Sequence, residues 1–175
     1  AVVMVSELKE TIMNSTVEIP GMQQMDAETF DVIVIGAGLS GVGTAVRLQR
    51  DCPDRDFILL ERREAIGGTW DLFRYPGIRS DSDMHTLGYD FKPWEAEKTI
   101  ADGPSILSYV NETADEYRIR ERIRFSQKLI AADWSSERSQ WQLTVETPDG
   151  TRRYRCGFLM MCAGYYSYDQ GYEPE

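Results

Sequence analysis

Residues 31–41 of the chain read DVIVIGAGLSG, and this stretch decides the fold. Its run of valine and isoleucine is typical of a buried strand and leads directly into the pattern Gly36-x-Gly38-x-x-Gly41. Residues 42–50 can form a helix immediately afterwards. A strand, a glycine turn and a helix in this order form the unit that binds the diphosphate of a dinucleotide.

Each glycine has its own physical role in this interpretation. Gly36 permits the tight turn, Gly38 lets the backbone approach a phosphate closely, and Gly41 lets the helix pack onto the strand. The start of the helix then offers unpaired N–H groups and a partial positive charge to the phosphates. A glycine turn with a purely steric purpose and no ligand is the alternative.

An acidic residue at the expected distance favours the dinucleotide over that alternative. Residues 57–61 read FILLE, a second apolar run that ends at Glu61, and a ribose-binding acid belongs about 20 residues beyond the glycine turn. A carboxylate there accepts hydrogen bonds from ribose hydroxyls and repels a 2′-phosphate. This first site is therefore expected to bind FAD or NAD rather than NADP.

The length and the composition indicate one globular domain with an ordinary hydrophobic core. The chain has 175 residues, of which 42% are hydrophobic and 27% are charged. Its formal net charge of −10 argues against nucleic acid as the main partner, because a phosphate backbone requires a basic surface. A dinucleotide is compatible with this charge, because backbone N–H groups and a helix dipole hold it.

The chain carries no sign of membrane insertion or export. No apolar run approaches the roughly 18 residues that cross a bilayer, and residues 1–25 lack the pattern of a signal peptide. We therefore expect no transmembrane segment. Cys52, Cys156 and Cys162 are odd in number and form no C-x-x-C pair, which fits a reducing cytoplasm. His85 is the single histidine, so neither a multi-histidine metal site nor a Ser–His nucleophile is expected.

The remaining pattern predicts an α/β domain with a small antiparallel β-meander inserted in it. Residues 1–29 look like an N-terminal extension with a short amphipathic helix at 5–13, and residues 30–175 form the domain. The expected strands are 30–35, 57–61, 123–125, 128–134, 140–147, 152–158 and a last buried strand at 159–163, and the expected helices are 39–50 and 104–117. The meander covers about 123–158, and we expect a three-layer Rossmann-like fold that binds a dinucleotide.

A long segment at residues 62–103 is rich in Gly, Pro, Asp and aromatic residues. A loop of this length inside a compact domain is usually functional, because a ligand or a partner orders it. Gly67 and Gly68 form a second place where backbone can lie against a phosphate or a flat cofactor. A solvated polar loop with a few core aromatic residues is the alternative.

Four motifs in this order and spacing resemble those of flavin-dependent monooxygenases of the Baeyer–Villiger type. They are GAGLSG at 36–41, Glu61, GGTW at 67–70 and RYPGIRSDSD at 74–83. The likeness extends from about residue 30 to residue 174 and includes TLGYDF, ADW and CAGYYSYDQGY. Residues 1–29 are not covered by it.

The resemblance implies that this domain holds FAD. Ser40 and the backbone of the glycine turn are implied to contact the diphosphate, and Glu61 to bind the adenosine ribose. Leu129 is implied to touch the adenine through its backbone. The residues implied to line the flavin side are Gly68, Thr69, Trp70, Asp71 and Leu72.

Asp81 is the residue to which the resemblance gives a catalytic role. In this family the corresponding aspartate lies beside the isoalloxazine ring and helps to position an arginine that stabilises the peroxyflavin. Arg79, Ser80 and Asp81 are also implied to border the NADPH site. His85 stands where a tyrosine is expected, and a spacer role is favoured over catalysis.

The implied reaction depends on NADPH and O₂. Enzymes of this family reduce FAD with NADPH, form a C4a-peroxyflavin and insert oxygen beside the carbonyl of a small-molecule ketone, or oxygenate sulfur or nitrogen. They carry a second glycine motif for NADPH and a fingerprint FxGxxxHxxxW, and neither occurs in the sequence. We therefore expect an NADPH domain absent from the chain, and an FAD-binding portion that needs the remainder of the enzyme as its partner.

Two other classes of protein share the first glycine motif. A flavin disulfide reductase places a redox cysteine pair soon after the second glycine turn, but no cysteine lies between Cys52 and Cys156. A nucleotide-binding module without catalytic activity needs no further motif. Flavin content and NADPH oxidation distinguish this module from an enzyme.

Overall fold

The computed structural model describes residues 27–166 and residue 174. Most of the expected N-terminal extension, including the helix at 5–13, therefore lies outside the described residues. The first strand, β1 (Glu28–Ile35), begins two residues before the expected start of the domain at residue 30. Its early residues pair with the last strand of the fold, because Glu28 lies opposite Tyr154.

A single six-stranded sheet forms the frame of the domain, with the strand order β3-β2-β1-β6-β5-β4. β1 pairs in parallel with both β2 and β6, and β2 pairs in parallel with β3. β5 pairs in antiparallel fashion with β4 and β6. The bounds of the strands are β2 (Phe57–Leu60), β3 (Ile123–Arg124), β4 (Lys128–Ser135), β5 (Gln140–Thr147) and β6 (Gly150–Met161).

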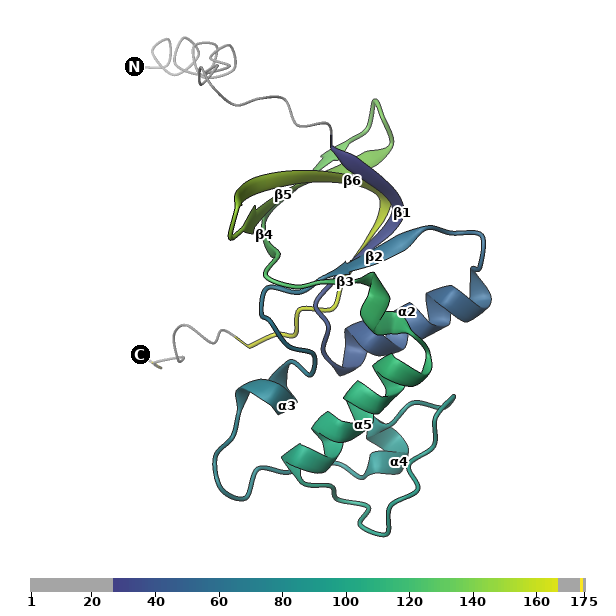
Figure 1. The fold of residues 1–175 in the computed structure, drawn as a ribbon, viewed down its shortest axis with the longest axis vertical. Coiled ribbons are helices and arrows are strands. Elements are labelled where there is room, and N and C mark those ends of the chain that lie inside the picture. Colours follow the sequence, from purple (N-terminus) through teal and green to yellow (C-terminus); the bar gives the residue numbers. More distant parts are fainter. Residues whose placement is uncertain (1–26, 167–173, 175) are drawn as a thin grey trace.

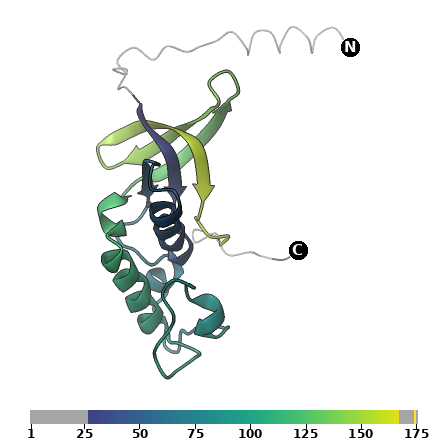
Figure 2. The same ribbon diagram turned by 90° about the vertical axis from the view of Figure 1, so that its right-hand side faces the viewer.

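The helices lie on one side of the sheet and the meander curls over the other side (Figure 1). The long helices, α2 and α5, lie below β1 and β2 in this view, and the view at 90° shows the same separation (Figure 2). The predicted three-layer α/β class is confirmed. The bounds of the helices are α2 (Leu39–Asp51), α3 (Thr69–Leu72), α4 (Met84–Leu87), α5 (Gly103–Glu116) and a 3₁₀ turn η1 (Ile119–Arg122).

Alternation along β1 divides the interior into two cores. Val32 and Val34 face the helices and join one apolar cluster, whereas Ile33 and Ile35 face the meander and join the other. Successive side chains of a strand point to opposite faces, so a strand buried on both faces has an unbroken apolar sequence. This explains why the VIVI run of residues 32–35 precedes the glycine turn.

Two predictions for the end of the chain were wrong. The expected strands 152–158 and 159–163 are one continuous strand, β6. Its first half pairs with β5 and its second half continues along β1, so one long strand serves both the meander and the parallel sheet. The second half is not buried either, since Phe158 is 73% exposed and Met161 is 61% exposed.

The long segment 62–103 contains more regular structure than its sequence indicates. Two four-residue helices, α3 and α4, lie within it, and Met84 is fully buried in the core beneath the helices. Asp83 caps α4, because its side chain accepts hydrogen bonds from the N–H and the hydroxyl of Thr86. These short helices escape a periodicity analysis because each comprises only about one turn.

The three cysteines differ in how deeply they are buried. All three are free thiols, with Cys52 at the surface and Cys156 buried in the core beneath the meander. Burial raises the pKa of the Cys156 thiol to about 11, which makes this side chain a packing residue rather than a nucleophile.

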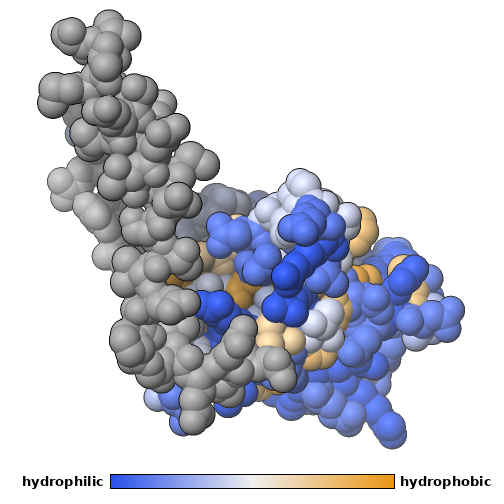
Figure 3. All heavy atoms as spheres, turned by 90° about the horizontal axis from the view of Figure 1, so that it is seen from above, coloured by the Kyte–Doolittle hydropathy of each residue, from blue (hydrophilic) through white to orange (hydrophobic). Residues whose placement is uncertain are grey.

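Polar side chains dominate the visible surface of the described residues when the molecule is viewed from above (Figure 3). None of the described helices is both long enough and apolar enough to cross a bilayer. Within residues 27–166 and at residue 174, no cluster of His, Cys, Asp or Glu is arranged to hold a metal ion.

Candidate functional site

The glycine turn at residues 36–38 connects the end of β1 to the start of α2, as predicted. Gly36 has φ of 102°, a conformation that favours glycine, and its N–H donates to the carbonyl oxygen of Leu60 at 2.8 Å. A Cβ atom at Gly36 would lie only 2.5 Å from the carbonyl oxygen of Cys162, the residue that follows β6. The turn therefore requires glycine at this position for both its φ angle and its space.

Gly41 has a different neighbour from the one that the sequence suggests. A Cβ atom there would lie 1.9 Å from the carbonyl oxygen of Gly36, and the next contacts are the Gly36 carbonyl carbon and the Cys162 side chain. The helix thus packs onto its own turn rather than onto the body of β1.

Replacing Gly41 with alanine is expected to destabilise the chain by about 3 kcal/mol, because the new methyl group overlaps a backbone oxygen that cannot move without opening the turn. Urea unfolding followed by circular dichroism measures this loss. Gly157→Ala is the matched control, since its Cβ would lie at an ordinary 3.4 Å from its nearest neighbour. Equal unfolding free energies for the two variants would contradict the geometry of the turn.

The start of α2 is open to an anion. Gly38 is its N-cap residue and no side chain caps the helix, whereas Asp83 caps α4 and Asp102 caps α5. The first N–H groups of a helix need a hydrogen-bond acceptor from outside the helix. In α4 and α5 a carboxylate supplies that acceptor, and at α2 a phosphate group fits the same requirement.

Glu61 lies directly beside this turn. Its carboxylate is 6% exposed at the residue level, and Oε2 accepts the N–H of Ala37 at 2.7 Å while Oε1 accepts the N–H of Arg63 at 2.9 Å. A carboxylate has about four lone-pair sites, so each oxygen can accept a further hydrogen bond from a ribose hydroxyl. The structure therefore brings the expected ribose acid and the expected phosphate turn together.

The second glycine turn meets the first one. Gly67 donates its N–H to the carbonyl oxygen of Ala37 at 3.0 Å, and a Cβ atom at Gly68 would lie 3.2 Å from the Cα atom of Gly38. Gly67 has φ of 121° and Gly68 has φ of 54°, so both adopt conformations that favour glycine. Two side-chain-free segments from distant parts of the sequence thus form one continuous backbone surface.

The residues that follow Gly68 form α3, and their roles differ. Trp70 packs against the core beneath the helices, and Thr69 and Leu72 are half-buried. Asp71 is buried, and its carboxylate pairs with Arg63 and also with Arg74 at 2.8 Å. The expectation that these residues line the flavin stays a prediction.

Arg79, Ser80 and Asp81 lie on a segment that is bound to the start of α5. Arg79 forms an isolated bridge with Asp102, and the N–H of Ser80 donates to the carbonyl oxygen of Ala101 at 2.9 Å. Ser80 is buried, whereas Arg79 and Asp81 are exposed. Their expected roles beside the flavin and NADPH stay predictions.

Leu129 lies near the start of β4, on the side of the meander. The preceding residues approach the ribose acid, because Gln127 donates its N–H to the carbonyl oxygen of Glu61 at 2.9 Å, and Ser126 donates to that of Arg63 at 3.1 Å. This pairing places the start of the meander beside the segment that follows β2. The expected contact of Leu129 with the adenine stays a prediction.

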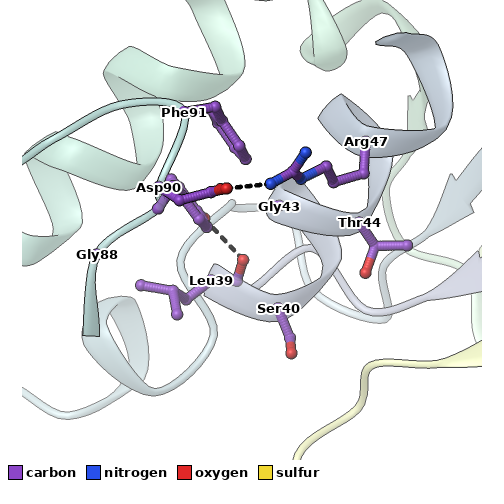
Figure 4. A pocket seen from close by; sticks show the side chains of 9 residues that line it. Leu39, Ser40, Gly43, Thr44, Arg47, Gly88, Asp90 and Phe91 are labelled. Atoms are coloured by element: carbon purple, nitrogen blue, oxygen red, sulfur yellow. Dashed lines mark hydrogen bonds and ion pairs between the residues drawn. The ribbon is translucent and has the colours of Figure 1, made fainter. Parts of the chain in front are cut away.

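A cavity of about 400 Å³ lies beside the first turns of α2 (Figure 4). Of the predicted site residues only Ser40 lines it, and the Ser40 side chain points away from the pair of Arg47 and Asp90. Tyr89 closes one side, since its hydroxyl donates to the carbonyl oxygen of Leu39 at 2.7 Å. Burial raises the pKa of Tyr89, so this hydroxyl remains a hydrogen-bond donor.

Arg63 and Tyr89 are the residues at this site that the sequence did not indicate. Arg63 stands two positions after the ribose acid, but its partners become its neighbours only when the second glycine turn is folded. Tyr89 touches α2 because Gly43 has no side chain and leaves room for the ring. A Cβ atom at Gly43 would lie only 2.7 Å from that ring. The glycine at position 43 is the one signal in the sequence that could have suggested a close aromatic neighbour.

Comparisons with known proteins agree with this geometry. A family model described as an NAD(P)-binding Rossmann-like domain matches residues 34–96. The chain is 55% identical over 148 residues to the FAD-containing monooxygenase EthA of Mycolicibacterium smegmatis, a match that covers 85% of this chain and 30% of that relative. The chain thus spans less than a third of the length of this curated relative.

Two solved structures show the same fold. The closed crystal structure of cyclohexanone monooxygenase matches with a TM-score of 0.69 and 26% identity, over 79% of this chain and 26% of that one. The crystal structure of OTEMO in complex with FAD and NADP matches with a TM-score of 0.69 and 31% identity over the same shares. Over the matched residues, the chain therefore resembles the N-terminal part of FAD-containing monooxygenases of the Baeyer–Villiger type and has their Rossmann-like fold.

Proposed function

We propose that the chain is the FAD-binding portion of an NADPH- and O₂-dependent flavin monooxygenase. The observation that carries the proposal is the uncapped start of α2 at Gly38, which lies close to Gly68 and next to the carboxylate of Glu61. This arrangement offers N–H donors to a diphosphate and acceptors to a ribose, which are the two requirements of a dinucleotide half-site.

FAD fits this set of donors better than a nucleotide that carries a 2′-phosphate. Glu61 is buried and bound to the backbone, so a second negative charge beside it would be costly. The names of the relatives support the same assignment, since one is called FAD-containing and another was solved with FAD and NADP. When bound, FAD supplies the redox and oxygen chemistry, and this chain holds the cofactor in place.

The activity of the complete enzyme is proposed from the same relatives. Oxidation of small-molecule ketones to esters or lactones is the reaction that Baeyer–Villiger monooxygenases perform, and oxygenation of sulfur is the second one that we propose. The exposed apolar side chains of β6, Phe158 and Met161, are consistent with a further part of the enzyme packing there. We also propose a cytoplasmic location, because three free cysteines fit a reducing compartment.

Measurements on the purified 175-residue chain test the proposal. We expect added FAD to bind, with quenched flavin fluorescence, while NADPH is not oxidised by the chain alone. The full-length M. smegmatis relative, assayed in parallel, is the positive control for NADPH oxidation. Absence of FAD binding would refute the cofactor assignment, and NADPH turnover by the chain alone would refute its role as a portion of a larger enzyme.

A structural nucleotide-binding module is the second candidate. Such a module would also bind FAD. It would differ from an enzyme portion because NADPH would not be oxidised when the rest of a flavin monooxygenase is supplied. We expect NADPH oxidation to appear when a polypeptide that supplies the NADPH-binding portion of the M. smegmatis relative is co-expressed with the chain. Continued absence of turnover, with both polypeptides folded and FAD bound, would favour the module.

A further inference from the structure

We propose that Arg63 is a positioning residue that holds the second glycine turn against the phosphate-binding turn and thereby sets the affinity for FAD. This inference rests on the proposed FAD site and adds to it a residue that acts through the second glycine turn. It concerns the guanidinium group of Arg63, which no motif of the sequence indicates.

The contacts of Arg63 converge on the second glycine turn. Its Nη1 atom donates to the carbonyl oxygen of Gly68 at 3.1 Å, and its Nη2 atom binds the carboxylate of Asp71. The guanidinium group therefore binds both the glycine at the start of α3 and the acid in the first turn of the same helix. A planar fork of donors suits this double task, which a single ammonium group performs less well.

Besides Arg63, backbone hydrogen bonds hold this turn, since the N–H of Gly67 donates to the Ala37 carbonyl oxygen at 3.0 Å and the Gly68 carbonyl oxygen accepts the N–H of Leu72 at 2.9 Å, and Arg63 adds a side-chain hydrogen bond to them. Gly68 combines φ of 54° with ψ of −122°, a combination that only glycine adopts readily, and glycine is the most flexible residue when it is not held. The same residue approaches Gly38 so closely that a Cβ atom at Gly68 would lie 3.2 Å from the Gly38 Cα atom. A small movement of Gly68 would therefore change the surface that a diphosphate meets.

The backbone of Arg63 also binds the ribose acid, Glu61. Its N–H donates to Oε1 of Glu61 at 2.9 Å, and its carbonyl oxygen accepts the N–H of Ser126 at 3.1 Å. Arg63 thus joins the ribose-binding carboxylate, the second glycine turn and the start of the meander. These are the three segments that the proposed site brings together around one half of the cofactor.

Arg74 provides a natural comparison because it binds the same carboxylate. Its Nη2 atom lies 2.8 Å from Oδ1 of Asp71, and its Nε atom donates to the Asp71 carbonyl oxygen. The Arg74 side chain is 73% exposed, whereas that of Arg63 is 26% exposed, and only Arg63 reaches Gly68. An exposed ion pair contributes little to stability, so the two arginines predict different outcomes.

The experiment titrates FAD into the 175-residue chain and its variants Arg63→Gln, Arg63→Lys and Arg74→Gln. We expect Arg63→Gln to weaken FAD binding about tenfold, because a charge-assisted hydrogen bond to Gly68 is lost. Arg63→Lys is expected to recover part of the affinity, and Arg74→Gln to stay within about twofold of the parent chain. The visible circular dichroism of bound flavin, recorded at saturating FAD, is expected to change in Arg63→Gln alone.

Hydrogen exchange in the absence of FAD makes the test independent of the proposed function. The Gly67 N–H, which donates to Ala37, is expected to exchange faster in Arg63→Gln and Arg63→Lys than in the parent chain, and unchanged in Arg74→Gln. If the parent chain does not bind FAD, the proposed function fails while this measurement still decides the role of Arg63. Equal exchange at Gly67 in all variants, or equal FAD affinities for Arg63→Gln and Arg74→Gln, would overturn the inference. If Arg63→Gln does not fold, the comparison of Arg63→Lys with Arg74→Gln decides by the same criteria.

Discussion

Gly38→Ala is expected to weaken FAD binding by at least about 100-fold, or about 3 kcal/mol, while the chain keeps its fold. The side-chain-free position at the start of α2 is where a diphosphate must come closest to the backbone. A methyl group there prevents several charge-assisted hydrogen bonds from reaching their normal length. Affinity follows from titration of the purified variant with FAD.

The structure predicts that this variant remains folded. Gly38 has φ of −79°, which any residue can adopt, and a Cβ atom would lie 3.6 Å from its nearest neighbour, the Cα atom of Gly68. Gly41→Ala, by contrast, is expected to lose about 3 kcal/mol of stability, because its Cβ atom would lie 1.9 Å from the carbonyl oxygen of Gly36. Gly157→Ala in β6 is the control that should change neither stability nor affinity. A Gly38→Ala variant that unfolds, or that binds FAD as tightly as the parent chain, would contradict the assignment of this turn.

Glu61→Gln is expected to weaken FAD binding by about 20-fold, because hydrogen bonds to a charged acceptor are lost. Both carboxylate oxygens of Glu61 accept backbone N–H groups, from Ala37 and Arg63. In glutamine an NH₂ group replaces one of the two oxygens. This donor then faces the backbone N–H of Ala37 or of Arg63, which is also a donor. A loss of stability of about 1–3 kcal/mol is expected as well.

A comparison of two nucleotides separates recognition from stability in this variant. The parent chain is expected to prefer ADP over the same nucleotide with a 2′-phosphate, because Glu61 repels the added charge. In Glu61→Gln this preference should decrease, whatever the stability of the variant. Glu64→Gln, at an exposed acid three residues further on, is the matched control and should keep the preference. An unchanged preference in Glu61→Gln would place the ribose elsewhere.

The start of the described fold, residues 28–60, follows from the sequence because each of its elements has its own signal. The VIVI run predicts β1, the glycines at positions 36 and 41 predict the turn and the start of α2, and the apolar run that ends at Glu61 predicts β2. The structure confirms these elements. The uncapped start of α2 is also visible in the sequence, because glycine stands where α4 and α5 have aspartate.

The end of the chain shows why other parts were not predictable. Residues 152–155 are rich in arginine whereas residues 158–163 are apolar, and this change predicts a break between two strands at Phe158 and Leu159. In the structure β6 continues through both residues, because it leaves β5 and continues along β1. Which strands β6 pairs with depends on the arrangement of the whole sheet. The sequence of β6 alone does not carry that information.

The second glycine turn shows the same limit at the site itself. The glycines at 67 and 68 predict a place for close backbone contact, and the structure supplies the neighbour, Gly38. The pairing of Arg63 with Asp71 could not be found, because neither spacing nor periodicity links an arginine after β2 to an acid in a four-residue helix. Contacts of this kind depend on the conformation of the intervening loop.

The most direct test of the central claim is an NMR titration of the isotope-labelled chain with FAD, followed through its backbone amide signals. The largest shifts are expected at the amides of Gly38, Leu39 and Ser40, where the helix offers its free N–H groups, and at Ala37 and Arg63, which bind Glu61. Shifts confined to the cavity beside Tyr89 and Asp90, with the glycine turn unchanged, would contradict the claim that this turn seats the diphosphate.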